Sequence, residues 1–319
     1  MWFLVLGPFI GLLSLVQLTL IGLFGDLPTF EQLENPKSNL ATEVITEDGI
    51  VLGKYFFENR SRASYNEIPQ NLITALIATE DVRFREHSGI DGRALLRAIF
   101  GAVIGKSSSG GASTITQQLA KMLFTKKPSS GIDRVMQKLK EWIIAAQLEK
   151  RYTKDEILTM YLNRFDWVNN AVGIKSAAGV YFNKKPFELD IKEAAMLVGM
   201  LKNPALYNPN RRLALTKGRR NVVLSQMNKY DFISDSLFDT LKNQPIVLDF
   251  KKASHNEGLA PYFREYLRGE LTKWCSNHTK PDGTNYNVYT DGLKVYTTIN
   301  SRLQSFAEEA MKIHISVIH

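Results

Sequence analysis

An acidic pair, Glu80-Asp81, follows a stretch with helical periodicity, and this pattern is the one in the sequence best suited to acid–base chemistry. Apolar residues precede the pair at spacings of three and four: Leu72, Ile73, Leu76 and Ile77. Glu80 is the next residue on that face, where a partly desolvated carboxylate is suited to accept a proton. Phe84 and His87 continue the face, which predicts a helix that ends at Gly89. The structural alternative is a salt-bridged Glu at the end of a core helix.

A second stretch, residues 107–124, combines small flexible residues with hydroxyl and amide side chains. Its second half predicts a helix that Ser113, Thr114 or Thr116 could cap. Free N–H groups at the start of a helix attract anions. Two adjacent amides, Gln117 and Gln118, stand in the first turns, where apolar or charged residues would serve stability better. The alternative is a plain linker that ends in a helix N-cap.

A third stretch predicts one long helix over residues 132–150, followed by a second helix whose start carries a capping box. On the first helix Arg134, Lys138 and Glu141 follow at spacings of four and three, so they share a face. A solvated ladder of ion pairs would explain that face. The functional alternative is that Lys138 and Arg134 bind phosphate while Glu141 holds a water or a divalent cation.

Length and composition narrow the class of protein. The chain has 319 residues with 44% hydrophobic content, enough for a sizeable core and one large or two ordinary domains. Forty basic and 32 acidic residues give a net charge of +8. That charge suits an anionic membrane surface, a phosphate-bearing substrate or nucleic acid, and it does not choose among them. The single cysteine, Cys275, excludes an intrachain disulfide and a multi-cysteine metal site.

The first 25 residues decide the compartment. Residues 2–25 contain no charged side chain, and a run of this length is about what a helix needs to cross the hydrocarbon core of a bilayer. We expect residues 1–25 to form a transmembrane anchor and residues 26–40, with two prolines, to form a short linker. A cleavable signal peptide is the alternative, but the apolar region is long for one and no small-residue cleavage site stands out.

The elements that would position these residues are mostly helical. Alternating residues around Asp48-Gly49 predict a β-hairpin near the start of a domain over residues 41–230. From residue 68 to about 227, helical periodicity dominates. The apolar run 95–104, with Arg93 and Arg97 beside it, predicts a helix lying in the membrane interface or an ordinary core helix. Residues 231–319 are less regular and end in a strand near 293–299 and a helix near 300–314.

Together these stretches resemble glycosyltransferase family 51, the peptidoglycan glycosyltransferase domain of class A penicillin-binding proteins and of monofunctional glycosyltransferases. Five motifs fall in the family's order over residues 40–230. They are Glu80-Asp81-x-x-Phe84-x-x-His87-x-Gly89, then Gly111-x-Ser113-Thr114-Ile115-Thr116-Gln117-Gln118, then Lys138-x-x-Glu141, then Lys154-Asp155-Glu156-Ile157-Leu158-x-x-Tyr161-Leu162-Asn163, and last Arg219-x-x-x-Val223-Leu224.

The chain departs from the family pattern in two ways. The third motif usually has an Arg before its Lys, and here that position is Gln137. The sequence also has no Ser-x-x-Lys, so it lacks the signature of the transpeptidase domain that follows in bifunctional members. Residues 292–299 nevertheless resemble the segment that leads into that domain. We therefore expect the front part of a bifunctional enzyme, in which residues 231–319 are a linker region.

The resemblance implies a lysozyme-like helical domain that polymerises lipid II into β-1,4-linked glycan strands, with inversion and release of undecaprenyl diphosphate. It implies that Glu80 is the general base and that Glu141 is catalytic beside the diphosphate, where Mg²⁺ remains an open possibility. Asp81, because it points to another side of the helix, is also expected to be structural. The implied substrate-binding residues are Asp81, Phe84, His87, Ser113, Thr114, Thr116, Gln117, Gln118, Arg134, Lys138, Lys140, Asn163 and Arg219.

The resemblance also implies partners and a location. The expected partners are lipid II, the growing glycan chain, the bilayer and other cell-wall synthesis proteins, with no nucleic acid. The expected location is the cytoplasmic (inner) membrane, crossed once, with the catalytic domain on the outer, periplasmic face. Two other functions are compatible with a Glu at a helix end. One is a lysozyme-like lytic enzyme, which would not need the basic third motif, and the other is a non-enzymatic envelope module, which would need none of the polar motif residues.

Overall fold

The computed structural model describes residues 41–55, 62–103, 113–124, 130–251, 259–281 and 283–318, together with residues 14, 17 and 19. The predicted anchor and linker fall almost wholly outside these residues, and so does Gly111 of the second motif. Within the described ranges, no helix combines the length and the apolar character that crossing a bilayer requires.

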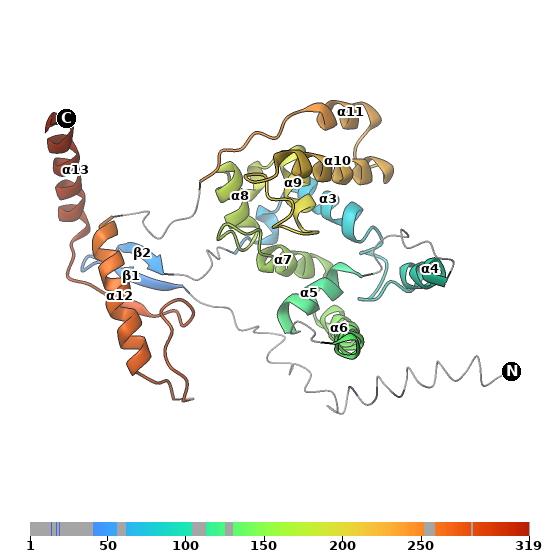
Figure 1. Ribbon diagram of the computed structural model, residues 1–319, viewed down its shortest axis with the longest axis horizontal. Coiled ribbons are helices and arrows are strands. Elements are labelled where there is room, and N and C mark those ends of the chain that lie inside the picture. The colour runs from blue at the N-terminus through green and yellow to red at the C-terminus, as the bar shows by residue number, and fades with distance from the viewer. Residues whose placement is uncertain are drawn as a thin grey trace.

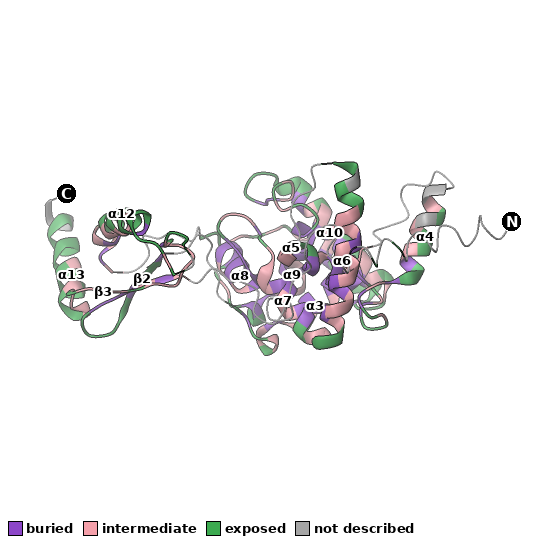
Figure 2. Ribbon diagram, turned by 90° about the horizontal axis from the view of Figure 1, so that it is seen from below, coloured by how far each residue is buried: buried purple, intermediate pink, exposed green. Residues whose placement is uncertain are grey.

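The described molecule is mainly helical, as predicted, and Figures 1 and 2 show two lobes. The strands are β1 (Thr42–Ile45), β2 (Val51–Tyr55) and β3 (Lys294–Tyr296). The first helices are η1 (Tyr65–Glu67), α3 (Gln70–Glu80), α4 (Gly92–Val103), α5 (Ile115–Phe124), α6 (Gly131–Arg151) and α7 (Lys154–Arg164). The others are α8 (Ile174–Phe182), η2 (Pro186–Glu188), α9 (Ile191–Met200), α10 (Leu213–Lys229), α11 (Asp235–Asn243), α12 (Pro261–Asn277) and α13 (Ser301–Ile318).

One continuous cluster of buried apolar side chains fills the helical lobe. α3, α9 and α10 pack against one another, and α5 packs against both α6 and α7. Leu72 and Leu76, two members of the predicted stripe on α3, are fully buried in this cluster. Burial of each such side chain contributes about 1.5–3 kcal/mol, so the stripe that precedes Glu80 anchors α3 in the core.

The predicted extension of this helix to Gly89 is wrong. α3 ends at Glu80, because Asp81 leaves the helical region with φ −161° and ψ 76°. Residues 82–89 form turns, in which the Phe84 N–H donates to the carbonyl of Asp81. The physical reason is that the carboxylate of Asp81 finds hydrogen-bond partners outside the helix. Glu80 is therefore the last residue of α3, directly before the loop.

The predictions for α5, α6 and α7 are confirmed. Thr114 caps α5, since its Oγ1 accepts from the Gln117 N–H at 3.1 Å. α6 extends one residue beyond the predicted range 132–150 at each end. α7 begins with the predicted capping box, in which Thr153 and Glu156 satisfy each other's backbone N–H groups.

The second lobe is a three-stranded sheet with helix α12 packed on it. The hairpin is confirmed, with β1 antiparallel to β2, and β3 pairs parallel with β1, so the strand order is β2-β1-β3. Buried Val44, Leu52 and Tyr55 form one cluster with Ala260, Cys275 and Val288. The hairpin was predicted as part of a 41–230 domain. In the structure its buried side chains cluster with residues of the segment 259–299, and β1 pairs with β3 of that segment.

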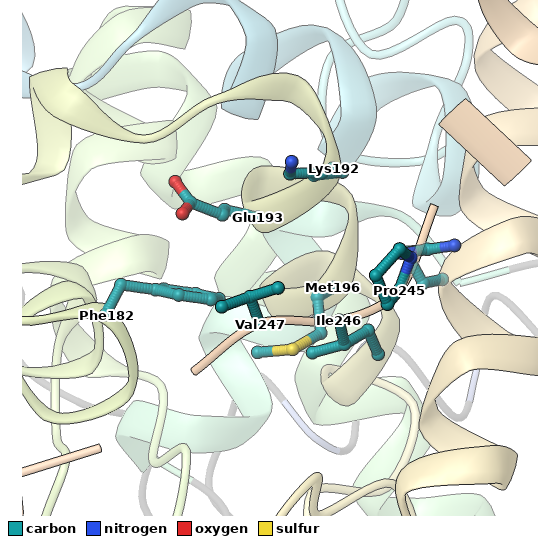
Figure 3. Close-up of a pocket in the computed structure, with 8 residues that line it drawn as sticks. Phe182, Lys192, Glu193, Met196, Pro245, Ile246 and Val247 are labelled. Atoms are coloured by element: carbon teal, nitrogen blue, oxygen red, sulfur yellow. The ribbon is translucent and has the colours of Figure 1, made fainter. Parts of the chain in front are cut away.

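Residues 244–251, which we call the strap, run from α11 back across the helical lobe. Arg220 Nη2 donates to the carbonyls of Leu241, Lys242 and Gln244, at 3.3, 3.2 and 2.8 Å. Figure 3 shows Ile246 and Val247 beside Phe182 and Met196, where a small pocket opens. The strap thus closes the lobe over α8, α9 and α10. The pocket lies beside the start of α9. Gly199, which contacts Arg219, lies near the other end of that helix.

α4 lies at the end of the helical lobe away from the strands (Figure 2). Leu96 and Phe100 are 57% and 63% exposed on it, and the Asp91 carboxylate accepts from the Ala94 N–H at the helix start. Arg83 pairs with Asp91 at 2.7 Å and ties this start to the loop after α3. α4 is therefore no ordinary core helix, because it presents large apolar side chains at the molecular surface.

Candidate active site

The carboxylate of Glu80 is held by residues from two other helices. Gln118 Nε2 on α5 donates to Glu80 Oε2 at 2.9 Å. Arg219 Nη2 on α10 lies 3.9 Å from the other oxygen, Oε1. The Glu80 side chain is 17% exposed, so it is largely shielded but still reachable. The structure thus brings together the predicted residues Glu80, Gln118 and Arg219.

Arg219 is itself oriented by the packing of α9 against α10. Its Nε donates to the carbonyl of Gly199 at 3.3 Å, and its guanidinium lies 6.0 Å from the ring centre of Tyr207. A Cβ added at Gly199 would lie 3.2 Å from Arg219 Cγ. The close approach that a glycine permits here places a positive charge near Glu80.

Asp81 joins the loop after α3 to the start of α5. Its carboxylate contacts His87 Nε2 at 3.0 Å and accepts from the Ile115 N–H at 3.1 Å. Both side chains are largely buried, since that of Asp81 is 4% exposed and that of His87 is 9% exposed. Asp81 and His87, both predicted to bind substrate, thus make contacts that support the loop after α3.

The carbonyl of Gly89 is the next link between this loop and α5. It accepts from Thr114 Oγ1 at 2.6 Å and from Gln117 Nε2 at 3.2 Å. Both side chains are at most 2% exposed. Thr114 and Gln117, predicted to bind substrate, are thus placed to hold Gly89 and the loop after α3 in position.

Thr116 and Phe84 are also enclosed by the fold. Thr116 Oγ1 donates to Glu149 on α6 at 2.6 Å, and Lys154 Nζ on α7 donates to the same carboxylate at 2.8 Å. Lys154 also donates to the His87 carbonyl and lies 4.4 Å from the ring centre of Phe84, which is fully buried. Glu149 and Lys154 therefore knit α5, α6, α7 and the loop together.

A second polar cluster lies where α6 passes the start of α5. Lys138 Nζ donates to Ser113 Oγ and to Glu141 Oε2, each at 2.9 Å. The Lys138 side chain is 36% exposed and that of Glu141 is 6% exposed. The ammonium group can thus face solvent while the carboxylate behind it stays buried. Ser113 precedes α5 by two residues and Gln118 is its fourth residue, so α5 positions a partner for each cluster.

Arg134 and Lys140 differ in their place on α6. Arg134 is exposed and lies one turn before Lys138 on the same face, as predicted. Lys140 is two residues after Lys138, and residues at that spacing do not face each other. Arg134 therefore shares the face of α6 that carries Lys138, whereas Lys140 lies on another face.

Asn163 lies apart from both clusters in its contacts. Its Oδ1 accepts from the Ala63 N–H and its Nδ2 donates to the Ala63 carbonyl, both at 2.8 Å. These bonds pin the segment before α3 to the end of α7. The Asn163 amide, which is predicted to bind substrate, thus makes both of these hydrogen bonds to the backbone of Ala63.

Tyr161 is the residue near Glu80 that the site prediction missed. Its hydroxyl donates to Gln118 Oε1 at 2.9 Å. Burial, and then the negative charge of Glu80, raise the pKa of Tyr161 well above its ordinary value, so the phenol is neutral. Although Tyr161 falls within the fourth motif, it also continues the apolar face of Ile157 and Leu158. Its type and spacing are those of a core residue, and only its place in the motif could have singled it out.

The residues near Glu141 fit a metal ion only together with a bound anion. Within the described ranges, no three acidic, histidine or cysteine side chains gather to form a cation site. Glu141 offers one carboxylate, which already accepts from Lys138. Mg²⁺ binds through one or two carboxylates when phosphate oxygens and waters complete its octahedral shell. Glu141 could therefore hold Mg²⁺ beside a diphosphate, but not in a cage made by the protein alone.

This helical domain has the features of a transferase or hydrolase that handles an anionic substrate, since the segment from Ser113 to Gln118 contacts both a shielded carboxylate and a lysine. Residues 48–228 match the family model described as "Transglycosylase". The chain belongs to this family, and the matched domain is a peptidoglycan glycosyltransferase domain.

Two curated relatives agree with this assignment. The chain is 33% identical over 289 residues to penicillin-binding protein 1A of Escherichia coli, covering 91% of this chain and 32% of that protein. It is 36% identical over 270 residues to penicillin-binding protein 1A of Haemophilus influenzae, covering 85% and 30%. A crystal structure of the Haemophilus protein aligns with a TM-score of 0.44 and 26% identity over 86% of this chain and 29% of that chain. The chain thus spans about a third of the length of these curated relatives.

Proposed function

We propose that the domain polymerises lipid II, with Glu80 as the general base of the reaction. The observation that carries this proposal is the environment of the Glu80 carboxylate, with Oε2 bound by Gln118 and Oε1 facing Arg219. A general base must be shielded from bulk water and still be reachable by the substrate, and the Glu80 carboxylate meets both conditions.

In the proposed step, the 4-hydroxyl of the incoming sugar attacks the anomeric carbon of the growing chain. The bond from that carbon to the diphosphate breaks with inversion, undecaprenyl diphosphate leaves, and the hydroxyl proton passes to Glu80. The leaving diphosphate needs positive charge rather than an acid. Lys138 and Arg134, with the hydroxyl of Ser113, are suited to bind it. Glu141 and the diphosphate oxygens would hold Mg²⁺, which would offset the negative charge that develops there.

A lipid substrate explains the exposed side of α4. Leu96 and Phe100 are exposed large apolar residues, and Arg93 and Arg97 lie on the same short helix. Such a helix can enter the headgroup region with its basic residues at the lipid phosphates. We therefore propose that the domain works at the outer face of the cytoplasmic membrane, anchored by residues 1–25 and assisted by other cell-wall synthesis proteins.

Glu80→Gln tests the role of the base. The variant should retain its fold, because the amide can still accept from Gln118, but it should lose glycan polymerisation from lipid II in detergent. Glu86→Gln is the matched control, since Glu86 is an exposed carboxylate in the same loop, and it should keep wild-type activity. Near wild-type synthesis by Glu80→Gln would contradict the assignment.

The reaction class can be separated from its alternative with two assays of the wild-type chain. Moenomycin, an inhibitor of this family, should block polymerisation of lipid II. Incubation with purified sacculi should release no soluble fragments. Release of fragments without polymerisation would favour the lytic enzyme instead.

A further inference from the structure

Three side chains from three helices form a continuous hydrogen-bonded chain that ends at Glu80. Tyr161 on α7 donates to Gln118 Oε1 on α5, and Gln118 Nε2 donates to Glu80 Oε2 on α3, each at 2.9 Å. Tyr161 is fully buried, and Gln118 is partly buried. We call this chain of three residues the Tyr161 relay.

The direction of every bond in the Tyr161 relay follows from the chemistry of its last member. An ionised carboxylate only accepts hydrogen bonds, so Gln118 must turn its NH₂ group toward Glu80. The amide oxygen then faces Tyr161, whose neutral hydroxyl donates to it. Because the terminal torsion of a glutamine is soft, the amide alone would not hold this orientation. The Tyr161 hydroxyl supplies the contact that selects it.

The other groups around Glu80 leave one oxygen available. Arg219, the charged residue that faces Glu80 from α10, is 3.9 Å from Oε1, which is beyond hydrogen-bond distance. The helix α9 also packs on α3, but its titratable residues are engaged elsewhere: Lys192 donates to Gln244, and Glu193 accepts from Lys184. Among the residues that the structure describes, Oε2 accepts a hydrogen bond from Gln118, whereas Oε1 accepts none and can take up a proton.

We infer that Tyr161 is a positioning residue that fixes the Glu80 carboxylate through Gln118 and leaves Oε1 as the proton-accepting atom. This inference rests on the proposed role of Glu80 as general base. It also reassigns Gln118 from substrate binding to the support of the base.

Tyr161→Phe tests the inference with the full chain in detergent and lipid II as substrate. The variant removes one oxygen, so the Gln118 amide can turn and its bond to Glu80 weakens. The acid limb of the kcat/KM profile against pH should move upward by roughly one pH unit, about tenfold in rate on that limb. KM on the plateau should change little. An acid limb that coincides with the wild-type limb would overturn the inference.

Tyr181→Phe is the matched control. Tyr181 is also fully buried, and its hydroxyl donates to the Trp167 carbonyl at 2.7 Å, outside the active site. This variant should lose stability in urea denaturation as Tyr161→Phe does, but its pH profile should stay at the wild-type position. An equal shift of the acid limb in both variants would show a general structural effect and would overturn the inference.

Gln118→Leu shows whether Tyr161 acts through the amide. Gln118→Leu should shift the acid limb by itself, and Tyr161→Phe should then add no further shift in the double variant. Additive shifts would contradict the Tyr161 relay. If Tyr161→Phe fails to fold, the acid limb of Gln118→Leu decides, and its coincidence with wild type overturns the inference. Activity retained by Glu80→Gln would instead show that the proposed function is at fault.

Discussion

A lysine beside a buried carboxylate is the second charged feature of the active site. Lys138 neutralises Glu141, which is buried, and Ser113 shares the same ammonium group. Breaking such a pair leaves a carboxylate that is shielded from water and lacks a partner. Solvent reaches about a third of Lys138, so screening reduces the cost relative to a fully buried pair.

We expect Lys138→Met to lower the free energy of unfolding by about 1–2 kcal/mol. The variant should also lose polymerisation of lipid II, because Lys138 is proposed to bind the diphosphate. Adding Glu141→Gln should recover most of the stability but none of the activity, because the buried charge is removed while the cation is still missing. Urea denaturation and the lipid II assay separate the two effects. Lys140→Met, on another face of α6, is the control. An unstable double variant would contradict the pairing.

The residues that carry charge or amides could be predicted from the sequence, but their partners could not. Glu80 stands out because it continues an apolar stripe, Gln118 because an amide occupies the first turns of a helix, and Lys138 because it shares a face with Arg134 and Glu141. Their contacts cross between helices that lie 25 to 139 residues apart in the chain. Periodicity within one helix carries no information on such distances. The resemblance implies that Asn163 and Thr114 bind substrate, and in the structure their hydrogen bonds go to the backbone.

At the scale of elements, the apolar spacing after Glu80 suggested a helix that the backbone does not form. Phe84 and His87 do keep to the core side, since Phe84 is fully buried and His87 contacts Asp81. They reach it from turns, which Lys154, Thr114 and Gln117 hold through the carbonyls of His87 and Gly89. A loop stabilised by other elements can mimic the hydrophobic pattern of a helix.

Gly89 is the backbone position on which this loop depends. Its φ of +88° lies in the left-handed region, and an added Cβ would lie 2.9 Å from the backbone carbonyl of Ala145 on α6. We expect Gly89→Ala to lower the free energy of unfolding by at least about 2 kcal/mol, from backbone strain and overpacking. Polymerisation should fall as well, because the Gly89 carbonyl accepts the hydrogen bonds of Thr114 and Gln117 that join this loop to α5.

Gly218→Ala provides the comparison for this prediction. Gly218 lies inside α10 with nothing within 4 Å of an added Cβ. Alanine there should raise the free energy of unfolding by roughly 0.5–1 kcal/mol, as expected in a helix interior. Thermal unfolding of the two variants should therefore shift in opposite directions. A Gly89→Ala protein as stable as wild type would show that the loop tolerates the change.

At the scale of the whole molecule, the two lobes are built from segments that alternate along the chain. The hairpin precedes the helical lobe, yet β1 pairs with β3 about 250 residues later. The strap after α11 closes the helical lobe beyond residue 228, where the family match ends. The sequence correctly predicts the hairpin and the strand near 293–299 as separate elements. It does not predict their pairing, because a three-residue parallel strand has no local signal for its partner.

The contact that joins the hairpin to α12 gives the sharpest test of this arrangement. Gly53 on β2 lies against the guanidinium of Arg264, and an added Cβ would be 2.3 Å from Nη1. Arg264 cannot simply swing away, because it is 2% exposed and its Nε donates to the Leu259 carbonyl at 2.9 Å. Gly53→Ala should therefore destabilise the second lobe by about 1–3 kcal/mol through overpacking.

The effect should stay within that lobe, because the hairpin and α12 share a cluster of buried residues separate from the core around α3. Amide hydrogen exchange should accelerate in residues 42–55 and 261–277 of Gly53→Ala, while residues 70–80 keep their protection. Gly269→Ala, on α12 with open space around it, should leave exchange in both lobes unchanged or slower. Equal acceleration in residues 70–80 would mean that the two lobes unfold as one unit, and lipid II polymerisation by Gly53→Ala would then fall with them.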